Sequence, residues 1–124
     1  MVVRGIRGAI TVDEDKPEEI KARTQELLTA LVSENNIDVE DIASALFSVS
    51  PDIKSAFPAE AARSMGWNMV PLFCFQEIEV EGAMPGCIRC LLHVNTLKKQ
   101  DEIRHIYLRE AVKLRQDLVN SRYE

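Results

Sequence analysis

The chain has 124 residues, of which 46% are hydrophobic and 28% charged, and we expect one compact domain spanning residues 1–124. The formal net charge of −5 disfavours nucleic acid as a partner, because proteins that bind it carry a broad basic face. No apolar run approaches the roughly 20 residues of a membrane span. The N-terminus has no signal-peptide pattern either, so we expect a cytoplasmic protein with no membrane partner.

The first third of the chain predicts a strand followed by a helix. Residues 2–12 are rich in β-branched side chains, which favour a strand. Residues 15–36 carry apolar side chains at helical spacing. Asp15 is the expected N-cap of this helix, because Glu18 completes an Asp-x-x-Glu capping box. The side chains expected on its buried face are Ile20, Thr24, Leu27 and Leu31.

The middle of the chain predicts two strands with a short helix between them. A turn at 38–41 leads into a strand at 42–50, which ends before Pro51. The alanine-rich stretch 57–66 ends in a glycine and predicts a short helix. A third strand is expected at 69–80.

The segment EGAMPG at 81–86 separates the third strand from a fourth at 87–96. Because six residues suffice for a hairpin, we expect these two strands to pair antiparallel. The tail mixes a helical pattern with β-favouring residues at 105–108. Strands alternating with helices predict an α/β (α+β) fold, in which helices pack on one face of a mixed sheet.

The three cysteines do not form a convincing metal or redox motif. Cys87 and Cys90 have Cys-x-x-Cys spacing, but residues three apart on a strand point to opposite faces, which disfavours a shared metal. Cys74 has no histidine in a recognisable motif relation to act as its base. We therefore expect free thiols, a reducing compartment and no metal site.

Several arginines occupy unusual places. For a single arginine, a strand edge or a side chain that reaches water is the commoner explanation. Arg89 is harder to explain this way, because apolar residues flank it and a guanidinium cannot be neutralised. Glu77, after the apolar run VPLFCF, poses the same problem with the opposite sign. Two interpretations remain: a structural Arg89–Glu77 ion pair, or a polar ligand site that both residues share. The other arginines in unusual places are Arg7, Arg63 and Arg115.

Five blocks of sequence carry a resemblance to a known family. They are RGIRGA at 4–9, FPAEAAR at 57–63, VPLFCFQE at 70–77, CIR at 87–89 and IRHIYLREAVKLR at 103–115. In this order they resemble the monofunctional chorismate mutases of the trimeric pseudo-α/β-barrel class. The resemblance implies the rearrangement of chorismate to prephenate in phenylalanine and tyrosine biosynthesis, without metal, cofactor or covalent intermediate. It also implies a homotrimer with active sites between adjacent subunits.

The same resemblance assigns roles to individual residues. Arg89 matches the arginine that hydrogen-bonds the ether oxygen, Arg7 one that binds a substrate carboxylate, and Glu77 the acceptor of the ring hydroxyl. Glu60 stands where the family often has lysine, and Gln116 replaces an expected proline, so closure of the tail is expected to be looser. The substrate-binding residues implied are Phe57, Ala59, Leu72 and Phe73 as pocket wall, Cys74 and Tyr107 as polar contacts, Arg63 and Arg115 as mobile or rim cations, and Leu114.

Two other functions remain open from the residues alone. One is an imine hydrolase of the similarly shaped trimeric deaminase fold, and the other is a non-catalytic sensor that binds a dicarboxylate through Arg7 and Arg89. With no separate regulatory domain in the sequence, we expect no response to phenylalanine or tyrosine. Large apolar residues that could serve a subunit interface are Phe57, Trp67, Met69 and Phe73.

Overall fold

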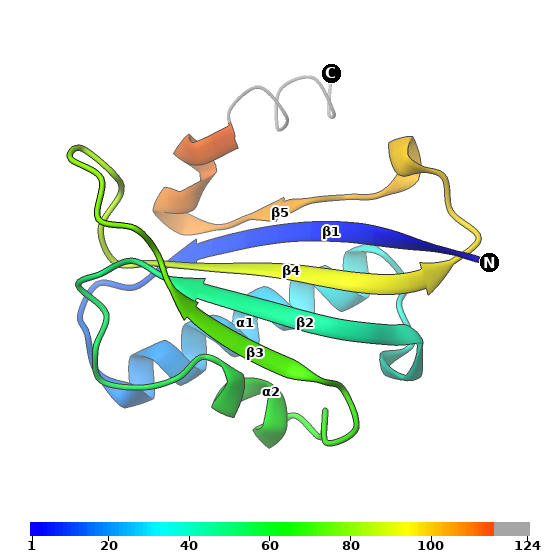
Figure 1. Cartoon of the computed structure of the whole chain (residues 1–124), viewed down its shortest axis with the longest axis horizontal. Helices are drawn as coiled ribbons and strands as arrows, with labels where there is room; N and C mark the ends of the chain where they lie inside the picture. Colours follow the sequence, from blue (N-terminus) through cyan, green and yellow to red (C-terminus); the bar gives the residue numbers. More distant parts are fainter. Residues whose placement is uncertain (116–124) are drawn as a thin grey trace.

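A computed structural model of the chain describes residues 1–115. They form one five-stranded sheet, with two helices behind it in the view of Figure 1. The strands are β1 (Val2–Thr11), β2 (Ile42–Val49), β3 (Leu72–Gln76), β4 (Cys87–Thr96) and β5 (Ile106–Tyr107). The helices are α1 (Pro17–Glu34) and α2 (Ala59–Ser64), and short 3-10 segments are η1 (Val39–Asp41), η2 (Gln100–Glu102) and η3 (Arg109–Arg115).

The strand order is β3-β2-β4-β1-β5. β4 runs antiparallel to both of its neighbours, whereas β2 is parallel to β3 and β1 is parallel to β5. The expected fold class, a mixed sheet with helices on one face, is confirmed.

The expectation that β3 and β4 pair as a hairpin is wrong, because β2 lies between these strands. The connection at 77–86 carries the chain past the end of β2. Gly86, its last residue, has a φ of 59°, a left-handed conformation that glycine adopts without strain. The Gly86 N–H donates to the Asp52 carboxylate at 2.9 Å, and the Val12 N–H donates to the Gly86 carbonyl at 2.8 Å. These bonds guide β4 into the place between β2 and β1.

The core lies between the sheet and α1. Alternate side chains of the strands face this helix, as the pleat of a sheet requires. Gly8 is one of these positions, and a Cβ there would lie 3.0 Å from a methyl carbon of Leu27, so glycine permits a close approach. All four residues expected on the buried face of α1 are buried. Within the described residues, neither α1 nor α2 combines the length and the apolar content needed to cross a membrane.

Two local expectations are wrong. Asp15 does not cap α1, whose N-cap is Lys16. The Asp15 carboxylate instead accepts hydrogen bonds from the N–H groups of Lys54 and Ser55 and from the Ser55 hydroxyl, which ties a distant loop to the start of the helix. The third strand ends at Gln76 and is therefore shorter than expected.

Candidate active site

The sheet face that turns away from α1 brings two of the predicted arginines together. Arg89 in β4 lies between Ala9 of β1 and Ser48 of β2 in the strand register. Arg7 pairs with Leu91, two residues further along β4, so Arg7 and Arg89 share one face. The Cα atoms of such diagonal neighbours are about 7–8 Å apart, within reach of long side chains.

Glu77 is held against the same face directly after β3. Its N–H donates to the Val49 carbonyl at 2.8 Å, which continues the pairing with β2. Its Oε1 accepts a hydrogen bond from Ser48 Oγ at 2.9 Å and lies 2.6 Å from Arg89 Nε. The Arg89–Glu77 ion pair considered from the sequence is therefore present, and Ser48 fixes the carboxylate.

The ion pair does not bury the whole Arg89 side chain. Nε lies buried against Glu77, but the Arg89 side chain as a whole is 42% exposed and that of Glu77 is 21% exposed. A guanidinium has five N–H donors, so those that do not face Glu77 can meet a ligand. The ion pair is therefore compatible with a polar ligand site shared by Arg89 and Glu77.

Arg89 also lines a cavity of about 330 Å³, a volume typical of sites for small molecules. Tyr107 reaches this cavity from β5, where it pairs with Ala9. His105, on the same segment, accepts a hydrogen bond at Nδ1 from the Arg7 N–H at 2.9 Å. The cavity is also lined by Arg7, Ser48, Phe75 and Leu91.

A second group of predicted substrate-binding residues lies around Cys74, on the opposite side of the sheet. Cys74 pairs in register with the buried Phe47, so it faces the helices and not Arg89. Burial raises the pKa of the Cys74 thiol, while the Ala59 N–H and the Arg63 guanidinium oppose this shift. The residues of this Cys74 group are Phe57, Ala59, Arg63, Leu72 and Cys74.

Glu60 adds a negative charge to the Cys74 group. It lines a cavity of about 430 Å³ together with Phe57 and Cys74. Its charge raises the pKa of Cys74, whereas the charge of Arg63 lowers it. Glu60 thus offsets part of the positive potential of Arg63 on this side.

Cys87 and Cys90 lie on opposite faces of β4, as the sequence predicted. Cys90 packs in the main core, whereas Cys87 packs beside Ala9 and Ala111. Burial raises the pKa of Cys87 to about 11, with Arg89 opposing the shift. Burial raises the pKa of Cys90 still further. Among residues 1–115, no group of three or more histidine, cysteine or acidic side chains is placed to hold a metal ion.

The remaining predicted residues fall in other places. Phe73 is exposed and lies on the Arg89 side of the sheet, since it pairs with Leu46. Leu114 packs against the small cluster that contains Cys87. The Arg115 side chain and the altered tail position Gln116 lie outside what the structure describes.

Sequence analysis missed Ser48 and His105. A serine in a strand is unremarkable by itself, and its partner Glu77 lies 29 residues away, directly after β3. The alternation within β2 was the available signal, because it places Ser48 on the same face as Ser44, opposite the buried Ala45 and Phe47. His105 was part of the block that carried the family resemblance, but no local pattern linked it to Arg7.

Comparison with known proteins decides the family. A family model described as "Chorismate mutase type I" matches residues 3–118. The chain belongs to this family. It is 52% identical over 118 residues to chorismate mutase AroH of Thermus thermophilus, covering 94% of this chain and 97% of that protein. It is 46% identical over 119 residues to chorismate mutase AroH of Bacillus subtilis (strain 168), covering 95% and 94%.

A solved structure agrees with these sequence matches. The chorismate mutase from Clostridium thermocellum superimposes with a TM-score of 0.86 at 45% identity, over 87% of this chain and 96% of that one. Chorismate mutases are isomerases that convert chorismate to prephenate for aromatic amino-acid biosynthesis, and this function is therefore the one the chain has. The family expected from the sequence is confirmed.

Proposed function

We propose that this chorismate mutase, a single domain over residues 1–124, binds its substrate between adjacent subunits of a homotrimer. Arg7, Glu77 and Arg89 of one subunit contact the reacting molecule. The reaction is an intramolecular pericyclic step in which a carbon–oxygen bond breaks as a carbon–carbon bond forms. It requires no nucleophile and no obligatory proton transfer, so the protein has to hold a compact chair-like conformer and stabilise the charge that develops.

The observation that carries the proposal is the partly exposed Arg89 guanidinium, which Glu77 holds beside the cavity that Arg7 and Tyr107 also line. The ether oxygen gains negative charge as its bond breaks, and a guanidinium is a donor that keeps its proton. Glu77 holds the guanidinium and accepts a hydrogen bond from the ring hydroxyl. Arg7 binds a substrate carboxylate through a charge-assisted hydrogen bond.

A subunit interface explains the two separate groups of residues. Arg89 and Cys74 lie on opposite sides of the sheet, so one chain cannot close both groups around one substrate. Phe57, Met69 and Phe73 are 65%, 92% and 62% exposed, which is unusual for large apolar side chains. Trp67, expected to join them, is only 2% exposed and belongs to the core. In a trimer, the Cys74 group of one subunit faces Arg7, Glu77 and Arg89 of its neighbour.

The other implied residues complete the site in this proposal. Tyr107 and Cys74 supply polar contacts, and Arg63 and Arg115 lie at the mouth as cations. The pocket wall is formed by Phe57, Ala59, Leu72 and Phe73, with Leu114 also contacting substrate.

We further propose a cytoplasmic location. The three cysteines are free thiols in the structure, which fits a reducing compartment.

The residue assignment is tested by following the loss of chorismate absorbance with purified wild type and an Arg89→Ala variant, and by identifying prephenate as the product. The proposal requires turnover by the wild type without added metal or cofactor and near loss of it in the variant. Comparable turnover by the two proteins would remove Arg89 from the mechanism.

Shared sites between subunits are tested by mixing two inactive variants. An Arg89→Ala chain and an Arg63→Ala chain are unfolded together and refolded, so that subunits assort at random. If each site uses Arg89 of one subunit and Arg63 of the next, about a quarter of the sites regain both arginines. Activity would then return on mixing. No recovery in properly assembled mixed trimers would place both residues in one chain's site.

A further inference from the structure

The last strand of the sheet is too short to position itself. β5 contains only Ile106 and Tyr107, which pair with Gly8 and Ala9 of β1. Strands in globular proteins usually have 3–10 residues, so a two-residue ladder supplies little of the energy that fixes its position. Tyr107 nevertheless lines the cavity beside Arg7 and Arg89. Other contacts must therefore determine where this residue lies.

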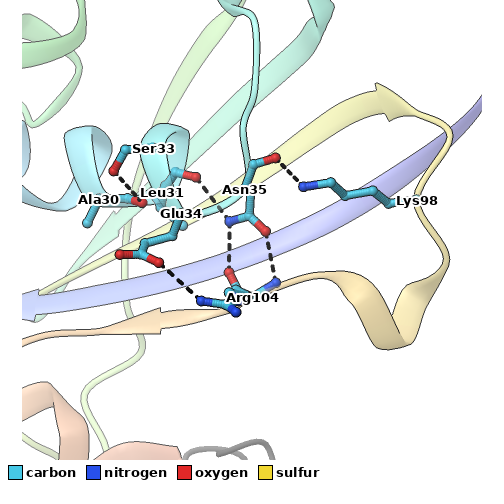
Figure 2. A network of polar contacts seen from close by, with 7 residues as sticks. All are labelled: Ala30, Leu31, Ser33, Glu34, Asn35, Lys98 and Arg104. Atoms are coloured by element: carbon cyan, nitrogen blue, oxygen red, sulfur yellow. Dashed lines mark hydrogen bonds and ion pairs between the residues drawn. The ribbon is translucent and has the colours of Figure 1, made fainter.

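Asn35, the first residue after α1, provides such contacts to the chain just before β5 (Figure 2). Its amide nitrogen donates to the Arg104 carbonyl at 2.9 Å, and the Arg104 N–H donates to its amide oxygen at 2.8 Å. The side chain thus engages both main-chain groups of one residue, as a neighbouring strand would. Its amide nitrogen also donates to the Leu31 carbonyl at 3.0 Å, and Lys98 Nζ donates to the Asn35 carbonyl.

Burial makes this contact strong. Asn35 is only 2% exposed, so breaking its hydrogen bonds would leave buried polar groups without partners. The Arg104 side chain adds an ion pair to Glu34 at 3.3 Å, but both groups are about half exposed, and such pairs contribute little. The main chain of Arg104 is therefore what Asn35 holds, independently of the arginine side chain.

The residues that follow Arg104 lead directly to the active site. The next residue, His105, accepts the hydrogen bond from the Arg7 N–H, and the N–H of Leu108 donates to the Ala9 carbonyl at 2.9 Å. Tyr107 lies between them. We propose that Asn35 is a positioning residue for chorismate binding, which sets the place of Tyr107 and His105 against β1. The inference rests on the proposed site, in which Arg7 and Tyr107 contact substrate.

A simple helix-capping role would not need this arrangement. A side-chain cap at the end of α1 requires one bond, such as the one to Leu31. The other two side-chain bonds of Asn35 reach Arg104, which is 69 residues away in the sequence. Loss of a cap would destabilise the helix, whereas loss of the Arg104 bonds would displace the segment that carries Tyr107.

The test compares Asn35→Ala with Arg104→Ala. Asn35→Ala removes all three side-chain bonds, while the control Arg104→Ala removes only the exposed ion pair and keeps the main-chain groups. Three quantities are measured well below the unfolding temperature of each protein: kcat for chorismate, KM for chorismate, and deuterium uptake by peptides covering 104–108 and β4. We expect Asn35→Ala to lower kcat/KM by about tenfold to a hundredfold, as misplacement of a binding group does. Uptake should rise in 104–108 and not in β4, and Arg104→Ala should match the wild type in both.

Several results would overturn the inference. Unchanged kcat/KM in Asn35→Ala would show that the contact does not serve the site, even if uptake rose in 104–108. Equal increases in uptake in β4 would indicate general destabilisation. If Asn35→Ala does not fold, Asn35→Ser, which cannot bridge both main-chain groups of Arg104, takes its place, and misfolding of both would refute a role specific to the site. Failure of the proposed site itself would show separately, as an active Arg89→Ala variant.

Discussion

Cys74 and Glu77 are separated by only two residues, yet they face opposite sides of the sheet. The strand between them stays regular, and Glu77 continues its pairing through the Val49 carbonyl. A site that uses both residues therefore needs two chains. This relationship, more than any single residue, explains why the predicted substrate-binding residues of one chain form two separate groups.

Replacement of Arg89 by alanine should have the largest effect on catalysis. Loss of one donor to developing charge commonly costs about a hundredfold to a thousandfold in rate. We expect Arg89→Ala to exceed this loss in kcat, because it also leaves the Glu77 carboxylate without its counter-charge. Arg23→Ala, which breaks an ion pair with Glu26 on α1, is the control and should keep wild-type turnover. A loss of less than about tenfold would contradict the electrostatic role.

Ser48 should matter for activity, although no sequence motif identifies it. Its hydroxyl donates to Glu77 Oε1 at 2.9 Å, and Ser48→Ala removes that bond. A hydrogen bond to a charged group is worth about 1.5–3 kcal/mol. Because both groups are partly exposed, we expect the lower end, about a tenfold fall in kcat/KM. Ser44→Ala is the matched control on the same strand and face, where the hydroxyl contacts His93 instead. Equal effects of the two substitutions would exclude a specific role for Ser48.

Cys74 should behave as a thiol and not as a nucleophile. Burial raises its pKa above the ordinary value of 9.0, so the thiolate is a minor form at neutral pH. We expect alkylation by iodoacetamide at pH 7.5 to be slower than that of a free cysteine in solution. Ionisation of Cys74 should therefore cause no change in activity between about pH 7 and 8.5. Alkylation faster than the free thiol would show that the thiolate is stabilised.

The Asp15 carboxylate should stabilise the fold in a pH-dependent way. The hydrogen bond from the Ser55 hydroxyl, followed by those from main-chain N–H groups, lowers its pKa below the ordinary value of 3.8. A lowered pKa in the folded state gives stability that is present above the unfolded-state pKa and is lost as pH falls through the folded-state value. Asp15→Ala should therefore unfold at a lower temperature than wild type at pH 7, and the difference should shrink below pH 4. Asp13→Ala, which leaves these contacts in place, is the control.

Gly8 should be intolerant of a side chain, in contrast to Gly5 on the same strand. A Cβ at Gly8 would lie 3.0 Å from Leu27 and 3.1 Å from Leu31, both fully buried. Overpacking of this kind costs about 1–3 kcal/mol. A Cβ at Gly5 would make an ordinary contact of 3.5 Å with Leu91. The unfolding temperature of Gly8→Ala should be well below that of Gly5→Ala. Equal unfolding temperatures would mean that α1 can move away from β1 without loss of stability.

Local patterns were enough to predict most of the elements. Periodicity identified α1, and the apolar run from Cys87 to Thr96 coincides with β4. Strand pairing was harder to predict from the sequence, because the partner of a strand is set by contacts far away in sequence. The hairpin expectation failed for this reason, since Asp52 and Val12 direct Gly86 past β2. The prediction that Asp15 caps α1 failed for the same reason, because its carboxylate binds a loop about 40 residues away instead of its own helix.

The candidate site was visible in the sequence only as an anomaly. Arg89 stood out because a permanent charge in an apolar strand requires a partner, and the structure supplies Glu77. Ser48 and Asn35 did not stand out, because neutral polar residues are common at strand and helix positions. Their importance comes from what the fold places beside them. The roles of Arg7, Tyr107 and the Cys74 group came from the family resemblance and stay predictions.

The strand order has a consequence for synthesis of the chain. β4 is fourth in sequence but third in the sheet, so β1 and β2 are joined only through residues 87–96, which lie between them. β2 can pair with β3 as soon as residue 76 has been made, but β1 has no partner in the sheet until about three quarters of the chain has been made. The contacts that close the sheet are long-range, which slows folding. Until then, α1 is the element already made that can cover one face of β1.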